Sequence, residues 1–211
     1  MESSAARETI LKNVRKALTQ KVPQPYPEIE RTDFAFEQLD GDLAVIFAEK
    51  FTSLLGKFSF CGDEEDLVAQ LRDLISQQGW KEIYCVDGQI KAILASFGLS
   101  TFSSAQLADS DAAITQCDFL VARTGSMVLS SAASSGRTTS VYAPVHICIA
   151  RVSQLVYDVK DALTAMQLKY GNKMPSMVSF ATGPSRTADI EKTLVVGVHG
   201  PKEVYCFLLD K

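Results

Sequence analysis

Apolar residues recur along this chain at two spacings, about four residues and two residues, which are typical of helices and strands respectively. The four-residue spacing predicts helices over residues 3–20, 39–55, 63–79, 90–97 and 153–170. Short apolar runs predict strands at residues 58–60, 83–86, 113–122, 127–129, 140–142, 147–150, 177–181, 194–198 and 204–209. Helices and strands alternate before residue 101, an order typical of βαβ units. We therefore expect an α/β fold with a mostly parallel sheet flanked by helices.

The first predicted helix stands apart from the rest of the pattern. Ile10, Val14 and Leu18 form its apolar face, and three prolines at alternate positions soon after it predict an extended linker. We therefore divide the chain into a helical arm with its linker, residues 1–27, and a domain over residues 28–211. The basic face of the arm is more typical of a solvated helix than of a membrane surface. The arm could also dock onto a second subunit, which would make the protein a homo-oligomer.

Composition narrows the classes of partner. The formal net charge of −4 offers no basic field, so we expect no nucleic-acid partner. The chain has no run of about 18 apolar residues and no long apolar segment at its start, so we expect no membrane span and no signal peptide. The five cysteines are scattered and form no CxxC pair. This pattern is typical of buried, reduced thiols, and predicts a cytoplasmic protein without a zinc or iron–sulfur centre of its own.

Candidate chemistry concentrates between residues 182 and 201, where the apolar residues 194–198 predict a short buried strand with a polar loop at each end. In the first loop, Gly183 exposes backbone N–H groups, Ser185 and Thr187 add hydroxyls, and Arg186 adds a planar fork that matches carboxylate or phosphate. This composition predicts a binding site for a small anionic metabolite. A capped turn with a solvated arginine is the alternative interpretation.

Acids and histidines supply the candidates for proton transfer and nucleophilic attack. Asp189 and Glu191 could form a carboxylate pair, with Glu191 as acid, base or acyl-accepting nucleophile, or they could cap a helix or pair with a neighbouring cation. His199, followed by Gly200, and His146 both lie near a predicted strand end, where either could act as acid or base near neutral pH. A histidine hydrogen-bonded to nearby backbone is the plainer interpretation of each. Their separation in sequence gives no local metal motif.

Two glycine-bearing turns complete the set of candidate binding residues. Thr124, Gly125 and Ser126 form a tight polar turn between two strand-like segments that resemble a hairpin, and Arg137 ends a small polar stretch over residues 130–137. Glycine lets backbone approach a ligand, and hydroxyls can donate to it. Plain turn geometry uses the same residues and is the more common explanation.

Three segments resemble one known family. TGPSRTADIEKTLVVGVHGP, at residues 182–201, resembles the C-terminal signature of the lactate-utilization protein C family, the LUD domain. ITQCDFLVARTGSMVL, at residues 114–129, resembles the central hairpin of that family, and PVHICIA, at residues 144–150, resembles its following strand. The resemblance covers roughly residues 40–211. One position departs from it, because the family often has an acid where this chain has Arg123.

The resemblance implies a fold related to the NagB/RpiA/CoA-transferase group. It also implies a role as a subunit of an iron–sulfur-dependent complex that oxidises L-lactate to pyruvate. In such a complex the partner subunits carry the iron–sulfur clusters, and this chain binds no cofactor of its own. The catalytic candidates remain Glu191 and His199, which are selected for the chemistry of their side chains and their place in the 182–201 motif. An independent CoA-transferase-like enzyme, or a small-anion-binding protein without turnover, is the alternative.

Overall fold

In the computed structural model of the protein, the described residues are 2–19, 40–100, 102, 106–187 and 195–210. The chain forms two compact units, Met1–Gln38 and Leu39–Lys211. The first unit contains helix α1 (Glu2–Thr19), whose apolar face, with Ile10, Val14 and Leu18, is exposed. None of the helices described in the structure is long and apolar enough to cross a membrane.

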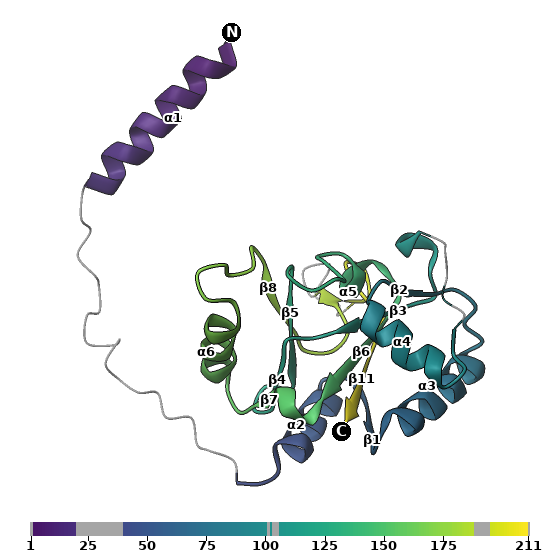
Figure 1. Cartoon of the computed structure of the whole chain (residues 1–211). Helices are drawn as coiled ribbons and strands as arrows, with labels where there is room; N and C mark the ends of the chain where they lie inside the picture. The colour runs from purple at the N-terminus through teal and green to yellow at the C-terminus, as the bar shows by residue number, and fades with distance from the viewer. Residues whose placement is uncertain (1, 20–39, 101, 103–105, 188–194, 211) are drawn as a thin grey trace. The chain divides into compact units, whose positions relative to one another are not determined.

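A five-stranded parallel sheet forms the centre of the second unit (Figure 1). Its order across the sheet is β1 (Lys57–Cys61), β11 (Glu203–Leu209), β6 (Val145–Arg151), β3 (Ala112–Gln116) and β2 (Ile83–Cys85). All four neighbouring pairs are parallel, as the pattern of the sequence predicts. The two longest strands, β6 and β11, lie inside the sheet and are apolar along most of their length, which is typical of strands buried on both faces.

Helices α3 (Glu64–Gln78) and α4 (Gly88–Ser96) cover one face of this sheet, where their buried residues share one core with alternate residues of the strands. Local signals set the bounds of both helices. The side chains of Asp63 and Asp87 accept hydrogen bonds from first-turn N–H groups, and Gly79 ends α3 with a φ of 68°. These caps confirm the predicted helices at residues 63–79 and 90–97.

A smaller sheet and helix α2 (Leu43–Ser53) pack against the opposite face of the parallel sheet. The order of the smaller sheet is β7 (Leu155–Val156), β4 (Phe119–Val121), β5 (Ser126–Ser130) and β8 (Val178–Ala181). Leu120 of β4 faces the parallel sheet, while Val121 faces helix α6 (Val159–Tyr170) on the outside. The unit is therefore layered as helices, parallel sheet, smaller sheet with α2, and helix α6, with the helices outermost (Figure 1).

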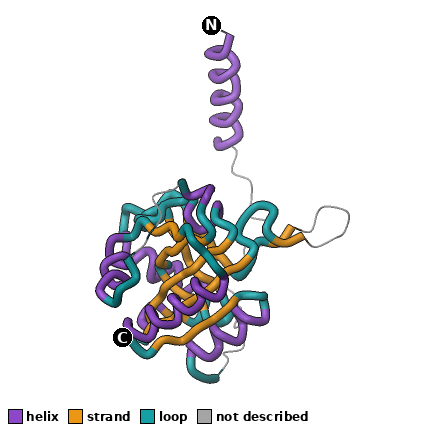
Figure 2. The backbone as a smooth tube through the Cα atoms, turned by 90° about the vertical axis from the view of Figure 1, so that its right-hand side faces the viewer, coloured by secondary structure: helices purple, strands orange, loops and turns teal. Residues whose placement is uncertain are grey.

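The remaining described elements are short. They are the 3₁₀ turns η2 (Leu107–Asp109) and η3 (Val152–Gln154), helix α5 (Thr139–Tyr142), and the antiparallel pair of β9 (Arg186–Thr187) and β10 (Val195–Val196), which extends from the body of the domain (Figure 2).

Four predicted elements were wrong. The apolar run 113–122 is two strands in different sheets, because the chain leaves the parallel sheet at Cys117 and Asp118 and pairs elsewhere. Residues 140–142 are helical, and the helix predicted over 153–170 starts only at Val159, after η3 and β7. The strand predicted at 194–198 is the two-residue β10, and it is not buried, since Val196 is 39% exposed. The local apolar pattern is the same in a core strand and in such a surface pair.

Candidate functional site

Three of the segments singled out in the sequence meet near the amino end of β11. Ser126 Oγ lies 2.7 Å from Thr182 Oγ1, and Thr124 Oγ1 lies 2.8 Å from Ser126 Oγ. Two residues after Gly183, the Ser185 N–H donates to the Pro201 carbonyl at 2.9 Å. We call the turns 124–126, 182–187 and 197–201 together the signature loops.

Two glycines let the signature loops approach the end of α2. Gly125 has a φ of 60°, and a Cβ there would lie 2.6 Å from the Phe51 backbone nitrogen. Gly183 has a φ of 97°, and a Cβ there would lie 2.5 Å from the Leu54 carbonyl oxygen. Only glycine adopts these angles readily and leaves room for the helix. Close packing therefore explains both residues without a ligand.

A hollow of about 450 Å³ opens beside the signature loops. His199, Gly200 and Lys202 line it together with Tyr142 of α5, a residue that is 64% exposed. Gly200 faces Ser185, since a Cβ on the glycine would lie 2.9 Å from the serine Cβ. The hollow thus presents an imidazole, an ammonium group and an aromatic ring, a combination able to hold an anion with an apolar part.

The other predicted site residues lie elsewhere or outside the described residues. Arg137 is exposed and donates to Ser176 Oγ at 2.5 Å. Arg186 and Thr187 form strand β9, with Arg186 exposed. Asp189 and Glu191 fall outside the described residues, so the structure does not place the predicted nucleophile.

His146 is buried inside the parallel sheet, 1% exposed, with its Nε2 2.8 Å from Thr115 Oγ1. Burial lowers the pKa of this imidazole from 6.5 to about 4, so it is neutral at physiological pH. His146 is therefore a core residue, but its partner is the side-chain hydroxyl of Thr115, whereas the plainer interpretation from sequence expected nearby backbone. It does not line the hollow beside the signature loops, and it is shut off from solvent.

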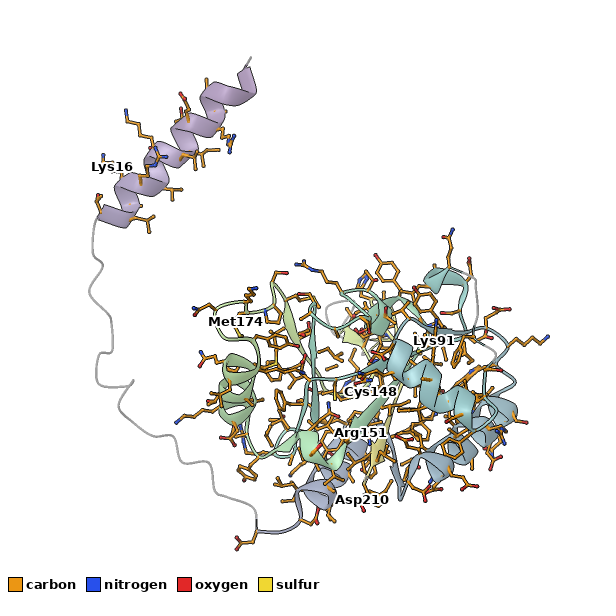
Figure 3. The ribbon with its side chains drawn as sticks, in the orientation of Figure 1. Lys16, Lys91, Cys148, Arg151, Met174 and Asp210 are labelled. Carbon is orange, nitrogen blue, oxygen red and sulfur yellow. The ribbon has the colours of Figure 1, made fainter. Side chains whose placement is uncertain are left out.

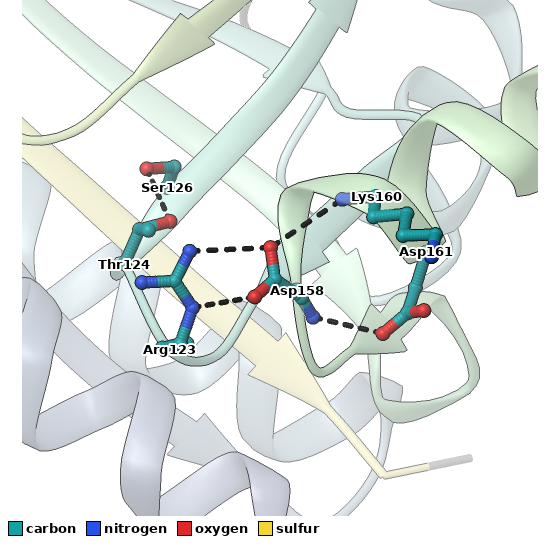
Figure 4. A network of polar contacts seen from close by, with 6 residues as sticks. All are labelled: Arg123, Thr124, Ser126, Asp158, Lys160 and Asp161. Carbon is teal, nitrogen blue, oxygen red and sulfur yellow. Dashed lines mark hydrogen bonds and ion pairs between the residues drawn. The ribbon is translucent and has the colours of Figure 1, made fainter. Parts of the chain in front are cut away.

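Arg123 ties the hairpin turn to α6 (Figure 4). Its Nε and Nη2 donate to the two carboxylate oxygens of Asp158, at 2.6 and 3.2 Å. Asp158 is the N-cap of α6 and forms a capping box with Asp161. The Arg123 guanidinium lowers the pKa of the Asp158 carboxyl, as expected for a bidentate pair. Arg123 therefore positions the turn on which Thr124 lies.

A second hollow, of about 170 Å³, lies at the carboxyl ends of β3, β6 and β11, and we call it the carboxyl-edge hollow. Gln116, Arg151 and Gln154 line it at or just after these strand ends, and Gln89 lines it from the start of α4. Figure 3 shows Arg151 on the same side of the domain as Asp210, which follows β11. Ligands of open α/β sheets bind outside the carboxyl ends of the strands. None of these four residues belongs to a local motif, so the sequence pattern does not single them out.

Asp87 holds the rim of the carboxyl-edge hollow together. Its Oδ1 accepts from the first N–H groups of α4 and, at 3.4 Å, from Gln116 Nε2. Its Oδ2 accepts from Ser134 Oγ at 2.6 Å, which brings the polar stretch 130–137 to the same edge. An acid directly after the strand at 83–86 was the sequence signal that could have identified this edge.

The thiols are placed for packing. The five cysteines are free and buried. Burial raises the pKa of the Cys61 thiol to about 12, so this side chain stays protonated. No group of three or more histidine, cysteine or acidic residues able to hold a metal ion occurs in the part of the chain that the structure describes. An iron–sulfur cluster needs several thiolates around one point, so the described side chains do not fit a resident cluster.

The fold and the signature loops define an α/β protein with a parallel central sheet, and comparison with known proteins identifies its family. The model of the LUD domain matches residues 45–209, so the chain belongs to the LUD domain family. A crystal structure of a DUF162 family protein from Deinococcus radiodurans superposes with a TM-score of 0.59 at 20% identity, covering 79% of this chain and 96% of that one. This likeness shows the fold alone.

Several curated bacterial proteins match part of the chain. Lactate utilization protein C of Geobacillus sp. is 41% identical over 101 residues, which are 46% of this chain and 42% of that protein. Lactate utilization protein C of Halalkalibacterium halodurans is 41% identical over 93 residues, or 43% and 40% of the two chains. An uncharacterized protein of Neisseria meningitidis is 33% identical over 118 residues, or 56% and 50%. The matches thus span half or less of the length of these relatives.

Proposed function

We propose that this chain acts in lactate utilization, as a subunit of a complex that oxidises L-lactate to pyruvate. The observation that carries the proposal is its membership of the LUD domain family together with its similarity to bacterial proteins named lactate utilization protein C. The assembled signature loops support it as well, because they place His199, and Ser185 beside Gly200, at a hollow that Lys202 also lines and that suits a small organic anion.

In this proposal the iron–sulfur clusters that take electrons from lactate belong to partner subunits. The burial of all five cysteines in this chain supports that division of labour. The chain would then bind the organic acid, or hold the subunit that oxidises it. Free thiols persist where the compartment is reducing, so we place the complex in the cytoplasm.

The test is genetic and biochemical. We expect deletion of the gene to abolish growth on L-lactate as the carbon source, and re-expression of the full chain to restore it. Purification of the tagged protein from lactate-grown cells should recover partner subunits with the absorption of iron–sulfur clusters. Normal growth of the deletion strain on lactate, with no such partner recovered, overturns the proposal.

A small-anion-binding protein without turnover is the second candidate, and the hollow beside Lys202 and His199 favours it. A bound anion that prefers the folded state raises stability by about 2.7 kcal/mol at a hundredfold excess over its dissociation constant. We expect lactate or pyruvate to raise the melting temperature under either candidate. Only lactate oxidation by the purified complex, abolished when this chain is omitted, separates the first from the second.

A further inference from the structure

The carboxyl-edge hollow differs in character from the hollow beside the signature loops. Its floor is apolar, since Ile90 and Leu94 of α4, Ile149 of β6 and Leu209 of β11 are buried. At about 170 Å³ it is smaller than the 300 Å³ or more typical of drug-sized ligands. The hollow therefore suits a molecule of a few heavy atoms with an aliphatic part.

Arg151 is the one charged side chain among the residues that line this hollow. It donates from Nη2 to Glu64 Oε1 at 3.0 Å, and the two side chains are 41% and 36% exposed. A guanidinium has five N–H groups, and this single contact uses one of them. Ion pairs at such exposure contribute little stability, so a competing carboxylate can replace or join Glu64 at small cost.

Two hydrogen-bonded glutamines fix the geometry around Arg151. Gln154 Oε1 accepts from the Arg151 backbone N–H at 2.7 Å, while its Nε2 donates to the Cys117 carbonyl at 2.5 Å. Gln116, whose Nε2 donates to Asp87, offers a carbonyl oxygen that can accept a hydrogen bond from a hydroxyl. A binding site needs such secondary support to hold its polar groups in place.

We propose that the carboxyl-edge hollow binds a short-chain carboxylic acid, with the carboxylate on Arg151 and the aliphatic part on the floor formed by Ile90, Ile149 and Leu209. A 2-hydroxy acid adds a hydroxyl that can donate to Gln116. This ligand class makes the proposed function more specific. It rests on that function in one respect, namely that lactate and pyruvate belong to the class. The site is separate from the signature loops, which lie near the opposite ends of the same strands.

Binding is measured on the full-length purified protein with acetate, L-lactate, pyruvate and butyrate, and with butyramide as the neutral counterpart of butyrate. Isotope-labelled isoleucine methyl groups locate the site by NMR, because Ile90, Ile93 and Ile149 line the hollow. We expect the acids to shift these methyl signals and butyramide to leave them unchanged. Butyramide shifts equal to those of butyrate, or shifts that occur only at isoleucines away from the hollow, such as Ile46 or Ile114, overturn the inference.

Three variants identify the carboxylate partner. Arg151→Gln should weaken binding of the acids about tenfold or more, through loss of a charge-assisted contact. Glu64→Gln should strengthen it several-fold, because the competing carboxylate is removed. Arg72→Gln is the control, because it changes the net charge by the same amount as Arg151→Gln. Arg72 lies on α3, where its guanidinium donates to the Phe97 carbonyl, and its substitution should leave the affinity for the acids unchanged. Equal affinities in all three variants contradict the proposal.

The outcome is independent of the proposed function. If the deletion strain grows normally on lactate but the purified protein binds acids through Arg151, the proposed lactate role is wrong and the proposed site is right. If the deletion strain fails to grow on lactate and no acid shifts the labelled methyl signals, the lactate role is supported and the proposed site is wrong.

Discussion

His146 shows at the scale of one residue how the surroundings decide what a side chain does. From sequence it was a candidate acid or base near a strand end. In the structure it is enclosed between the two sheets, with Thr115 as its hydrogen-bonding partner, and burial lowers its pKa to about 4. An imidazole that is neutral and enclosed contributes to the specificity of the core, and it makes the stability of the domain depend on pH.

The sign of this dependence follows from the two pKa values. In the unfolded chain the imidazole takes up a proton as the pH falls below about 6.5, whereas in the folded domain it does so only near 4. Its contribution is therefore fully present above pH 6.5 and is lost as the pH falls toward 4. We expect a loss of about 2 kcal/mol in the free energy of unfolding between pH 7 and pH 5.

Urea denaturation at pH 7 and pH 5 measures this difference. His146→Gln should reduce the difference in unfolding free energy between the two pH values. His199→Gln, at an exposed position, should retain the difference found for the natural protein. The change in unfolding free energy is taken between the two pH values within each variant, so a general loss of stability in His146→Gln cancels. Equal slopes in the two variants are the result that contradicts the assignment.

At the scale of elements, the end of α2 is where the hairpin of β4 and β5 meets the segment that follows β8. Gly125 and Gly183 make this meeting possible, since each has a positive φ and faces the helix backbone. The sequence correctly predicts a hairpin turn and a glycine turn there. It could not show that the two turns share one helix, since they are far apart along the chain.

Substitution of two glycines separates the effect of close packing from the effect of the backbone angle. Gly125 and Gly136 have similar φ values, 60° and 64°, but a Cβ at Gly136 meets nothing within 4 Å. We expect Gly136→Ala to cost about 1 kcal/mol of stability, from the left-handed angle alone. Gly125→Ala should cost about 3 kcal/mol or more, because the α2 backbone must also shift. Denaturation midpoints compare the two, and equal losses show that the turn and helix are not in contact.

At the scale of the molecule, the chain consists of two compact units, Met1–Gln38 and Leu39–Lys211. The second unit contains both sheets, both hollows and the part of the chain that matches the LUD domain. The signature loops lie toward the amino end of strand β11 in the parallel sheet, and the carboxyl-edge hollow lies at the carboxyl ends of β3, β6 and β11. This division places two candidate binding regions on one rigid sheet, so each can be altered without the other.

Removal of residues 1–38 tests the independence of the units. Because the second unit is compact by itself, we expect the shortened chain to melt within about 2 °C of the full chain. Removal of residues 1–56 is the control, since it also deletes α2 with the buried rings of Phe47 and Phe51, and it should prevent cooperative folding. A large drop in melting temperature for the first truncation contradicts the division into units.

The sequence by itself determined the elements whose signals are local, and it determined the family. Helix α3 has its apolar spacing, the cap Asp63 and the terminal Gly79 within 17 residues, and strands β6 and β11 are apolar enough to require burial on both faces. Periodicity and capping depend on neighbours along the chain, so such elements can be predicted from sequence.

Only the tertiary structure decided which of these elements touch. It divided the apolar run 113–122 between two sheets, enclosed His146, and brought Gln116 and Arg151 together at one edge of the parallel sheet. These outcomes depend on contacts between residues far apart in sequence, and each residue involved is ordinary in its local context. A motif marks a site only when its residues are neighbours along the chain, and for that reason the signature loops could be found from sequence. At the other edge of the sheet, Asp87 is the one local signal, and no local pattern marks Gln116 or Arg151 as lining a hollow.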